Sequence, residues 1–142
     1  MRHMMRSAGL VPDLVLVSPA RRTMETLAAL QPWDKPPLID AKKELYLATA
    51  LGMLQLLRNV SDRVRSILLI GHNPGLQELA VLLVRAHTHK GGAAGKRALS
   101  LAKAYPTCAL AEIAVTAPWS EIGEGSGKLT RFVTPRDPNA VD

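Results

Sequence analysis

Apolar residues recur at intervals of three and four in four windows of the chain, which is the spacing of one helix face. The inward positions predicted for these helices are Met1, Met4, Met5 and Ala8; Met24, Leu27, Ala28 and Leu30; Leu47, Leu51 and Leu54 with either Ala50 or Leu57; and Leu76, Leu79, Ala80, Leu83 and Val84. Gly9 is predicted to end the first helix and Pro32 the second. Ser18 and Asn73, each followed by a proline, are the predicted N-caps of the second and fourth helices.

Short apolar runs between these windows predict strands. Residues 14–17 and the run SILLIG (66–71) are almost wholly apolar, as in strands that are buried on both faces of a parallel sheet. The segments CALAEIAV (108–115) and KLTRFVT (128–134) predict an antiparallel pair, joined through a glycine-rich turn. Strands that alternate with helices predict a three-layer α/β/α sandwich, with a mostly parallel sheet and an antiparallel edge.

The remaining stretches are predicted connections. Residues 32–46 are expected to be loop with one short extended piece, and HTHKGGAAGKR (87–97) is expected to be a flexible glycine-rich connection. The tail 135–142 is expected to be loosely held. A chain of 142 residues is long enough for one core, so a single domain over residues 1–142 is expected.

Composition narrows the functional classes. The chain is 47% hydrophobic and 21% charged, which is typical of globular proteins. The single cysteine, Cys108, excludes an intrachain disulfide, fits a reducing compartment and is expected to act as a small buried hydrophobe. No apolar run approaches the roughly 20 residues that cross a bilayer. The first ten residues lack the apolar stretch of a secretory signal, so a cytoplasmic protein without a membrane partner is expected.

The net charge of +6 points to an anionic partner. Nucleic acid is disfavoured, because the basic residues are dispersed, aromatic residues make up only 4% of the chain and no recognised nucleic-acid-binding module is present. An anionic small ligand explains the charge equally well.

Two basic segments follow predicted strands at their carboxyl ends. The first strand runs into SPARR, which places Arg21 and Arg22 in the first turn of a helix, and the SILLIG strand runs into GHNPG, which carries His72. Ligands of open α/β sheets bind beyond these strand ends, and a helix N-terminus offers free N–H groups to phosphate. Taken alone, each arginine is equally well a solvated charge and His72 a turn residue. Together, the two segments predict a phosphate site.

These segments resemble the histidine phosphatase superfamily, most closely its small SixA-type phosphohistidine phosphatases. The resemblance is carried by DLVLVSPARRTMETL, ELYLA, ILLIGHNPGLQELA, YPTCALAEI and LTRFVTPRD, and it extends over nearly the whole chain from about Leu10. It implies phosphoryl transfer through a phosphohistidine intermediate without metal or other cofactor, in which arginines and a second histidine hold the phosphoryl oxygens. The implied substrate is a phosphohistidine in a protein, with a small phosphoester as the other candidate.

The resemblance assigns roles to five positions. His72 matches the second histidine and Arg22 the arginine after the serine-proline pair, which makes both of them catalytic and phosphate-binding candidates. Arg21 is a neighbouring phosphate-binding candidate. Glu44, just ahead of LYLA, is the candidate acid for the leaving group, or else a solvated carboxylate. Asn73 is a candidate phosphate donor, or else only the helix cap.

In the family, the nucleophilic histidine belongs to an Arg-His-Gly motif at the end of an N-terminal strand, well upstream of the SPARR segment. The Arg-His pair of this chain is Arg2–His3, which is followed by methionine instead of glycine. With Met1, Met4 and Met5 inward, His3 is predicted to lie on the solvent face of a helix. We therefore expect that the family's first strand is missing through truncation or a misplaced start codon, and that this chain alone is inactive or impaired.

Other motifs carry less weight. KGGAAGKR (90–97) resembles a Walker A loop, but Lys90 stands where its first glycine is required and Arg97 where its Ser or Thr is required. His87 and His89 have no third ligand nearby, so no metal site is expected there. Three functions stay open on the sequence: a SixA-type phosphatase, a non-catalytic phosphate- or phosphoprotein-binding protein, and a basic nucleic-acid-associated module.

Overall fold

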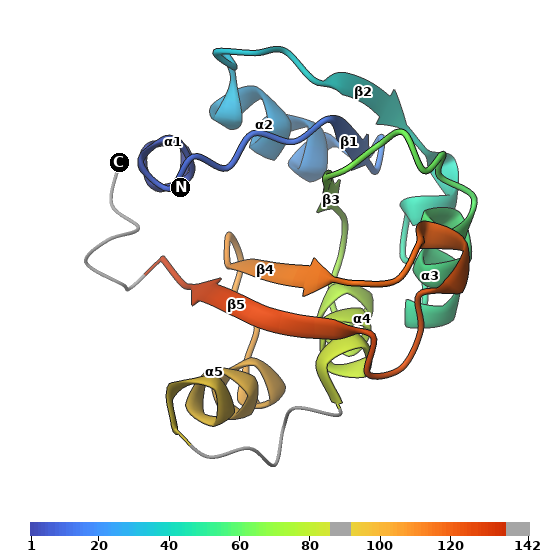
Figure 1. The fold of residues 1–142 in the computed structure, drawn as a ribbon. Coiled ribbons are helices and arrows are strands. Elements are labelled where there is room, and N and C mark those ends of the chain that lie inside the picture. Colours follow the sequence, from blue (N-terminus) through green and yellow to red (C-terminus); the bar gives the residue numbers. More distant parts are fainter. Residues whose placement is uncertain (86–91, 136–142) are drawn as a thin grey trace.

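The computed structural model of the chain describes residues 1–85 and 92–135. Its centre is a parallel sheet with the strand order β2–β1–β3 (Figure 1). β1 (Leu14–Val17) pairs with β2 (Leu38–Ala41) on one side and with β3 (Ile67–Ile70) on the other. The helices, in chain order, are α1 (Arg2–Ser7), α2 (Arg21–Leu30), α3 (Ala50–Arg58), α4 (Gly75–Val84) and α5 (Gly92–Lys103). The two apolar runs therefore form strands where the sequence predicts them.

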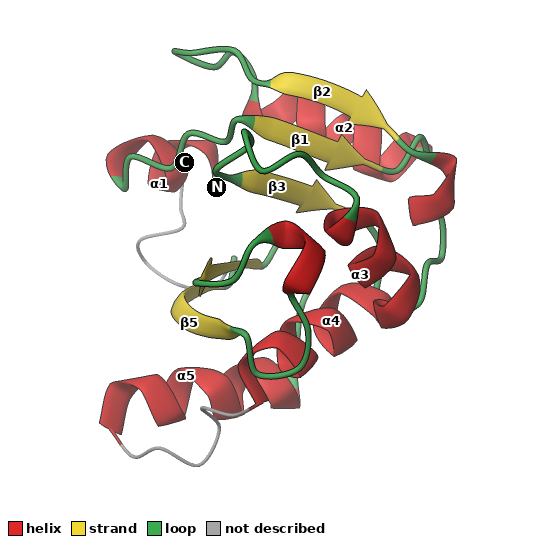
Figure 2. Ribbon diagram, turned by 45° about the vertical axis from the view of Figure 1, so that its right-hand side comes forward, coloured by secondary structure: helices red, strands yellow, loops and turns green. Residues whose placement is uncertain are grey.

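Helices cover both faces of the parallel sheet (Figure 2). Val15 and Val17 point to one face, where they are buried with Met5 of α1 and Leu27 of α2. Leu16 points to the opposite face and is buried among residues of α3 and α4. Because side chains alternate in direction along a strand, a strand covered on both faces needs apolar residues at every position. The sequence of β1, LVLV, meets this requirement.

The predicted antiparallel pair forms a second sheet. β4 (Leu110–Val115) pairs with β5 (Gly127–Val133), and a short 3₁₀ turn at Trp119–Glu121 lies between them. The pair is not hydrogen-bonded to the parallel sheet in the described part of the chain. The α/β class is therefore confirmed, with the antiparallel strands present as a sheet of their own beside the parallel one.

The helix α5 corrects the prediction of a connection over residues 87–97. Residues 92–103 are helical, while His87 and His89 lie outside the described residues. Gly92 and Gly95 lower the helix propensity of this segment, and for this reason the sequence pattern did not predict a helix here. Tertiary packing compensates, because Leu101 is fully buried in a cluster with Val84 of α4 and with a residue of β5.

Two predicted helix starts also differ from the structure. α2 does not begin directly after Ser18, because Ser18 still belongs to the strand ladder and donates its N–H to the Ile70 carbonyl at 3.0 Å. α4 begins at Gly75 instead of directly after Asn73. Asn73 nevertheless keeps a cap-like contact, because its Oδ1 accepts the N–H of Gln77 at 3.2 Å.

Four predicted inward side chains are exposed: Met24, Ala28, Leu47 and Leu51. Cys108, which was expected to be buried, is exposed as well. In α2 the predicted inward residues Leu27 and Leu30 are buried, and the third buried residue is Thr23, next to the exposed Met24. The hydroxyl of Thr23 lies 2.7 Å from the carbonyl oxygen of Ser18. Leu47 precedes α3 and has a left-handed backbone (φ 51°), so it is not part of the helix face. The described helices include none that is both long enough and apolar enough to cross a membrane.

Candidate phosphate site

The carboxyl ends of β1 and β3 lie side by side. The parallel register pairs Val17 with Ile70, which are the last residues of the two strands. Ser18 and Gly71 therefore leave the sheet at the same level, and His72 follows one residue later. The SPARR and GHNPG segments are thus brought to one edge of the sheet, the edge at which open α/β sheets bind ligands.

A serine side chain holds His72. The Nε2 atom of His72 lies 2.9 Å from Oγ of Ser18, and Ser18 is fully buried. The same hydroxyl oxygen accepts the N–H of Ala20 at 3.3 Å. The hydroxyl of Thr23 lies within hydrogen-bond distance of the Ser18 and Ala20 carbonyl oxygens, at 2.7 and 2.8 Å. The link between β1 and α2 is therefore fixed by side chain-to-backbone contacts, and it presents a fixed oxygen to the imidazole.

An aromatic ring contacts the same imidazole from a different segment. The rings of Tyr46 and His72 meet edge to face, with centroids 5.4 Å apart and planes at 81°. Tyr46 directly follows a short 3₁₀ turn at Lys43–Leu45, and its side chain is largely exposed. His72 is therefore held on one side by a buried hydroxyl and contacted on another by an exposed aromatic ring.

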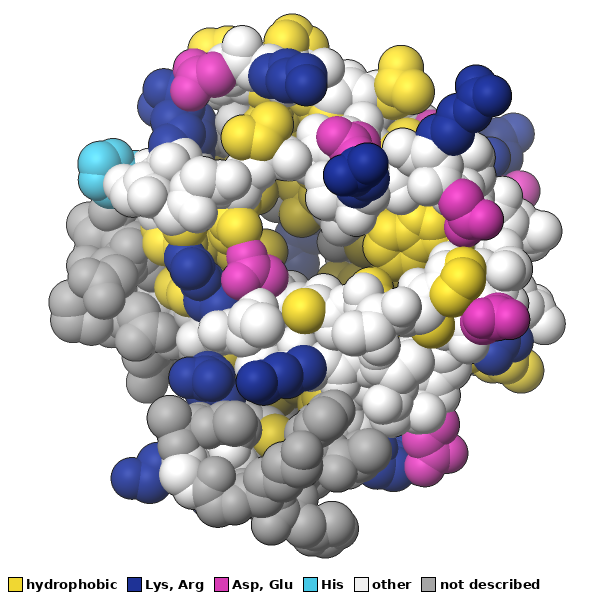
Figure 3. All heavy atoms as spheres, viewed as in Figure 1, with side chains coloured by type: hydrophobic (Ala, Val, Ile, Leu, Met, Phe, Trp, Pro, Cys, Tyr) yellow, Lys and Arg dark blue, Asp and Glu magenta, His cyan; other side chains and the backbone are white. Residues whose placement is uncertain are grey.

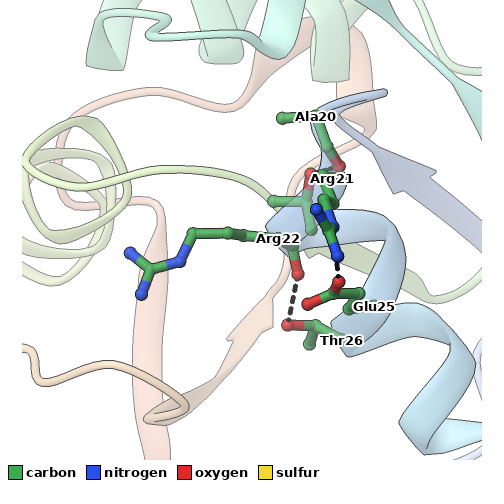
Figure 4. Close-up of polar contacts among 6 residues, drawn as sticks. Ala20, Arg21, Arg22, Glu25 and Thr26 are labelled. Carbon is green, nitrogen blue, oxygen red and sulfur yellow. Dashed lines mark hydrogen bonds and ion pairs between the residues drawn. The ribbon is translucent and has the colours of Figure 1, made fainter.

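The two arginines at the start of α2 point in different directions (Figure 4). Arg21 is paired with Glu25 along the helix surface, with Nε 3.0 Å from Oε1. The side chain of Arg22 extends away from this pair, and its guanidinium has no hydrogen-bond or ion-pair partner among the described residues. Arg22 lies four residues after Ser18 and is exposed, so its five N–H donors are available to an anion.

Asn73 is engaged by the protein at both ends of its amide. Its Nδ2 donates to the Tyr105 carbonyl at 2.8 Å, and its Oδ1 accepts the N–H of Gln77 at 3.2 Å. The phenol of Tyr105 is buried beside Phe132, and this desolvation raises its pKa above the ordinary value. Asn73 thus joins the start of α4 to the segment before β4. These two contacts give the side chain a structural role that needs no ligand.

Glu44 is an exposed side chain in the 3₁₀ turn at Lys43–Leu45. None of the interactions within the described residues joins its carboxylate to His72 or to Arg22. It is two residues before Tyr46, so its turn borders the site while the side chain remains in solvent.

His3 is an exposed residue of α1, and α1 packs at the C-terminal end of α2, away from His72. The guanidinium groups of Arg2 and Arg6 donate to the carbonyls of Gln31 and Pro32, at 3.0 and 2.8 Å, and so dock α1 onto the C-terminal end of α2. The ten residues of α2 span about 15 Å at 1.5 Å per residue. The prediction that His3 lies outside the site agrees with this arrangement.

The contacts with Ser18 and Tyr46 escaped the sequence prediction. The sequence offered a signal for Ser18, because a polar residue directly after a buried strand continues the ladder before it can cap a helix. It offered none for Tyr46, because the ring contact joins two loops that are far apart in the sequence. Chemically, the edge holds an imidazole, a guanidinium without a partner among the described residues and a helix N-terminus, which together suit a phosphate-like oxyanion. No group of three His, Cys, Asp or Glu side chains within residues 1–85 and 92–135 is placed to hold a metal ion.

Comparison with known proteins gives sequence relatives without an assigned function. No family model matches the chain. Two uncharacterized proteins of Mycobacterium tuberculosis, MT1313 and Rv1276c, are each 29% identical to it over 128 residues, which is 87% of this chain and 74% of each relative.

The solved structures that are similar are SixA proteins. The candidate phosphohistidine phosphatase SixA of Nakamurella multipartitia matches with a TM-score of 0.79 and 21% identity, over 96% of this chain and 78% of that one. The candidate SixA of Agrobacterium tumefaciens matches with a TM-score of 0.71 and 24% identity, over 94% and 75%. A protein histidine phosphatase SixA complexed with tungstate gives 0.65 and 20%, over 94% and 76%. The chain therefore has the fold of these SixA structures.

Proposed function

We propose that this chain carries the phosphoryl-binding half of a phosphohistidine phosphatase site of the SixA type. The observation that carries the proposal is the contact of His72 with Ser18 at the paired ends of β1 and β3. Arg22 lies four residues after Ser18, and its guanidinium has no partner within the described part of the chain. The SixA-like fold supports it, and one protein of that fold is complexed with tungstate, an oxyanion. The substrate proposed is a phosphohistidine in a protein, with a small phosphoester as the other candidate.

Each side chain has a distinct part in this proposal. Arg22 donates two N–H groups to neighbouring phosphoryl oxygens, the geometry in which a guanidinium binds an oxyanion most strongly. His72 donates from the ring nitrogen that Ser18 does not contact, because the contact at Nε2 fixes the direction of the other nitrogen. Arg21 adds positive potential without direct contact, since Glu25 engages its guanidinium.

The attacking histidine is the part that we do not assign to a residue of this chain. His3 is its only histidine in an Arg-His pair, and it lies on α1 at the end of α2 remote from His72. A nucleophile must come within about 3 to 3.5 Å of phosphorus to react. We therefore propose that the 142-residue chain binds phosphate but does not turn over a phosphorylated substrate by itself.

Binding and turnover are measured separately to test this. Inorganic phosphate and tungstate are titrated into the chain by calorimetry, with His72→Ala as the site variant and His3→Ala as its matched control. We expect saturable binding that falls at least about ten-fold in His72→Ala and is unchanged in His3→Ala, because only His72 faces the proposed anion.

Phosphate release from a phosphohistidine-containing protein is then followed with the same three proteins. We expect a rate at background for all of them. Turnover that survives His72→Ala would contradict the proposed site, and turnover lost in His3→Ala would assign the nucleophile to α1. Salt-sensitive nucleic-acid binding without any effect of phosphate would instead support the nucleic-acid alternative.

A further inference from the structure

Tyr46 is the one exposed aromatic residue of this chain, and it lies at the candidate phosphate site. The chain has two Trp, two Tyr and one Phe, and all five lie within the described residues. The other four are at least partly buried: Trp33, Tyr105, Trp119 and Phe132. Tyr46 is 59% exposed, although an aromatic ring stabilises a fold chiefly through burial. Packing therefore does not account for the position of this ring.

Contacts on both sides of Tyr46 fix the segment that carries it. Before Tyr46, the N–H of Lys42 donates to the last carbonyl of β1 at 2.9 Å, and Leu45 is fully buried in a cluster with residues of α3 and α4. After Tyr46, the carbonyl oxygen of Ala48 lies so close to Gly75 that an added Cβ atom would overlap it. The segment is therefore anchored both to the end of β1 and to the start of α4, which flank the candidate site.

The contact with His72 uses only part of the Tyr46 ring. The two ring centroids are 5.4 Å apart and the planes meet at 81°, and neither ring contacts another aromatic ring within residues 1–85 and 92–135. More than half of Tyr46 is exposed to solvent beside this contact. An exposed aromatic surface therefore borders the imidazole that is proposed to bind the phosphoryl group.

The two candidate substrates differ in the group that is bonded to phosphorus. In phosphohistidine this group is an imidazole, which is planar and aromatic, whereas in a small alkyl phosphoester it is an oxygen on a saturated carbon. Charge does not separate them, because both offer phosphoryl oxygens to Arg22 and His72. Figure 3 shows Lys and Arg side chains interspersed with Asp and Glu over the face that it draws, not gathered into one patch. Selection between the two substrates therefore needs a contact with the group bonded to phosphorus.

We propose that Tyr46 is the specificity-determining residue of the site, and that its exposed ring contacts the imidazole of a phosphohistidine substrate. The inference rests on the proposed function, because His72 must hold the phosphoryl group for this contact to form. A phosphoryl oxygen that accepts a hydrogen bond from His72 lies about 2.9 Å from a ring nitrogen, which keeps the rest of the substrate near the Tyr46 ring. Aromatic pairs form with centroids about 4.5 to 7 Å apart, and one such pair favours the aromatic substrate about three- to ten-fold.

The test compares two phosphonates that differ only in the ring bonded to phosphorus. One carries the phosphonate group on a pyrazole ring, and the other, cyclopentylphosphonate, carries it on a saturated ring of the same size. Each is titrated into the full chain by calorimetry, at a pH at which both phosphonates are doubly ionised. We expect the pyrazole compound to bind about three- to ten-fold more tightly, because only its ring forms an aromatic pair with Tyr46. The ratio of the two affinities is the readout, since the phosphonate group contributes equally to both.

Two substitutions of Tyr46 separate the effect of the aromatic ring from that of apolar surface. Tyr46→Phe keeps the ring and should leave the ratio unchanged, whereas Tyr46→Leu keeps an apolar side chain without the ring and should bring the ratio close to one. In both variants the affinity for cyclopentylphosphonate should stay within about two-fold of the parent value, because the contacts to the phosphonate oxygens are retained. Leu47→Ala is the matched control, because Leu47 is 66% exposed and directly follows Tyr46. Its ratio should equal that of the parent protein.

A ratio near one in the parent protein would overturn the role of Tyr46, as would a ratio that Tyr46→Leu leaves unchanged. An equal loss of both affinities in Tyr46→Leu would also overturn it, because Tyr46 would then act only by positioning His72. In these three cases, binding of cyclopentylphosphonate that is lost in His72→Ala would still support the phosphate site. Absence of binding by both phosphonates and by inorganic phosphate would contradict the proposed function, and this inference with it.

Discussion

The Nε2 atom of His72 lies 2.9 Å from the hydroxyl oxygen of Ser18, at the paired ends of two parallel strands. Ser18→Ala should lower the affinity for inorganic phosphate by about three- to ten-fold, because a lost hydrogen bond of this kind is worth roughly 1 kcal/mol and the imidazole loses its fixed direction. Calorimetric titration measures the change.

Ser66→Ala is the matched control for this serine. The Ser66 hydroxyl accepts the N–H of Asp13 at 3.0 Å and lies 3.3 Å from the Val11 carbonyl, at the opposite end of the same two strands. Both variants should be less stable in urea, but only Ser18→Ala should lose phosphate affinity. Equal loss of affinity in the two variants would show that Ser18 acts through stability alone.

Substitutions of the two arginines of α2 should have different effects on phosphate affinity in the same titration. Arg22→Ala is expected to reduce phosphate affinity about ten-fold or more, because its guanidinium, which no other described residue engages, is proposed to make the charge-assisted hydrogen bonds. Arg21→Ala removes the same charge from the neighbouring position, where Glu25 already engages it, so a loss of less than about three-fold is expected. A larger loss in Arg21→Ala than in Arg22→Ala would reverse the assignment.

Gly75, the first residue of α4, marks a close approach between α3 and α4. A Cβ atom added there would overlap the carbonyl oxygen of Ala48 and the end of the Met53 side chain. Gly75→Ala should therefore lower the free energy of unfolding by about 1 to 3 kcal/mol, measured by urea denaturation. Gly71→Ala is the control, because its Cβ would meet only Leu76 at ordinary contact distance, 3.6 Å.

The buried phenol of Tyr105 should make the folded protein less stable at alkaline pH. Burial raises the pKa of its phenol above 10.0, so the folded protein holds this proton more tightly than the unfolded chain does. The stability that results is fully present below the unfolded pKa and is lost as the pH rises through the folded pKa. Tyr105→Phe should therefore show a smaller fall in melting temperature above pH 10 than the parent protein, with no such difference in slope at pH 7.

The core of the fold was predictable from sequence because it depends on local composition. β1 and β3 are apolar at every position, and this pattern predicts strands that are buried on both faces. The helix α5 was not predictable in this way, because its glycines argue against a helix and only packing around Leu101 supports it. Local pattern fails where tertiary contacts outweigh propensity.

The site was predictable in its residues but not in its contacts. His72 and Arg22 could be chosen because each follows a strand end or starts a helix. The contact of His72 with Ser18 needed the register between two strands, which no single segment contains. The contact of His72 with Tyr46 likewise joins two separate segments of the chain. Next to Tyr46, Leu47 has a left-handed backbone, a conformation that a leucine rarely adopts and that the sequence does not indicate.

Ser18 and His72 are 54 residues apart in the chain, and they meet only through the pairing of Val17 with Ile70. A shift of one residue in that pairing would turn the side chains of one strand to the other face. It would also part the hydroxyl from the imidazole. Phosphate binding therefore reports whether β1 and β3 are paired in the native register, as well as whether the side chains of the site are present. Bound phosphate should in turn select the native register during refolding, because an anion held between the two segments stabilises only the state in which both are in place.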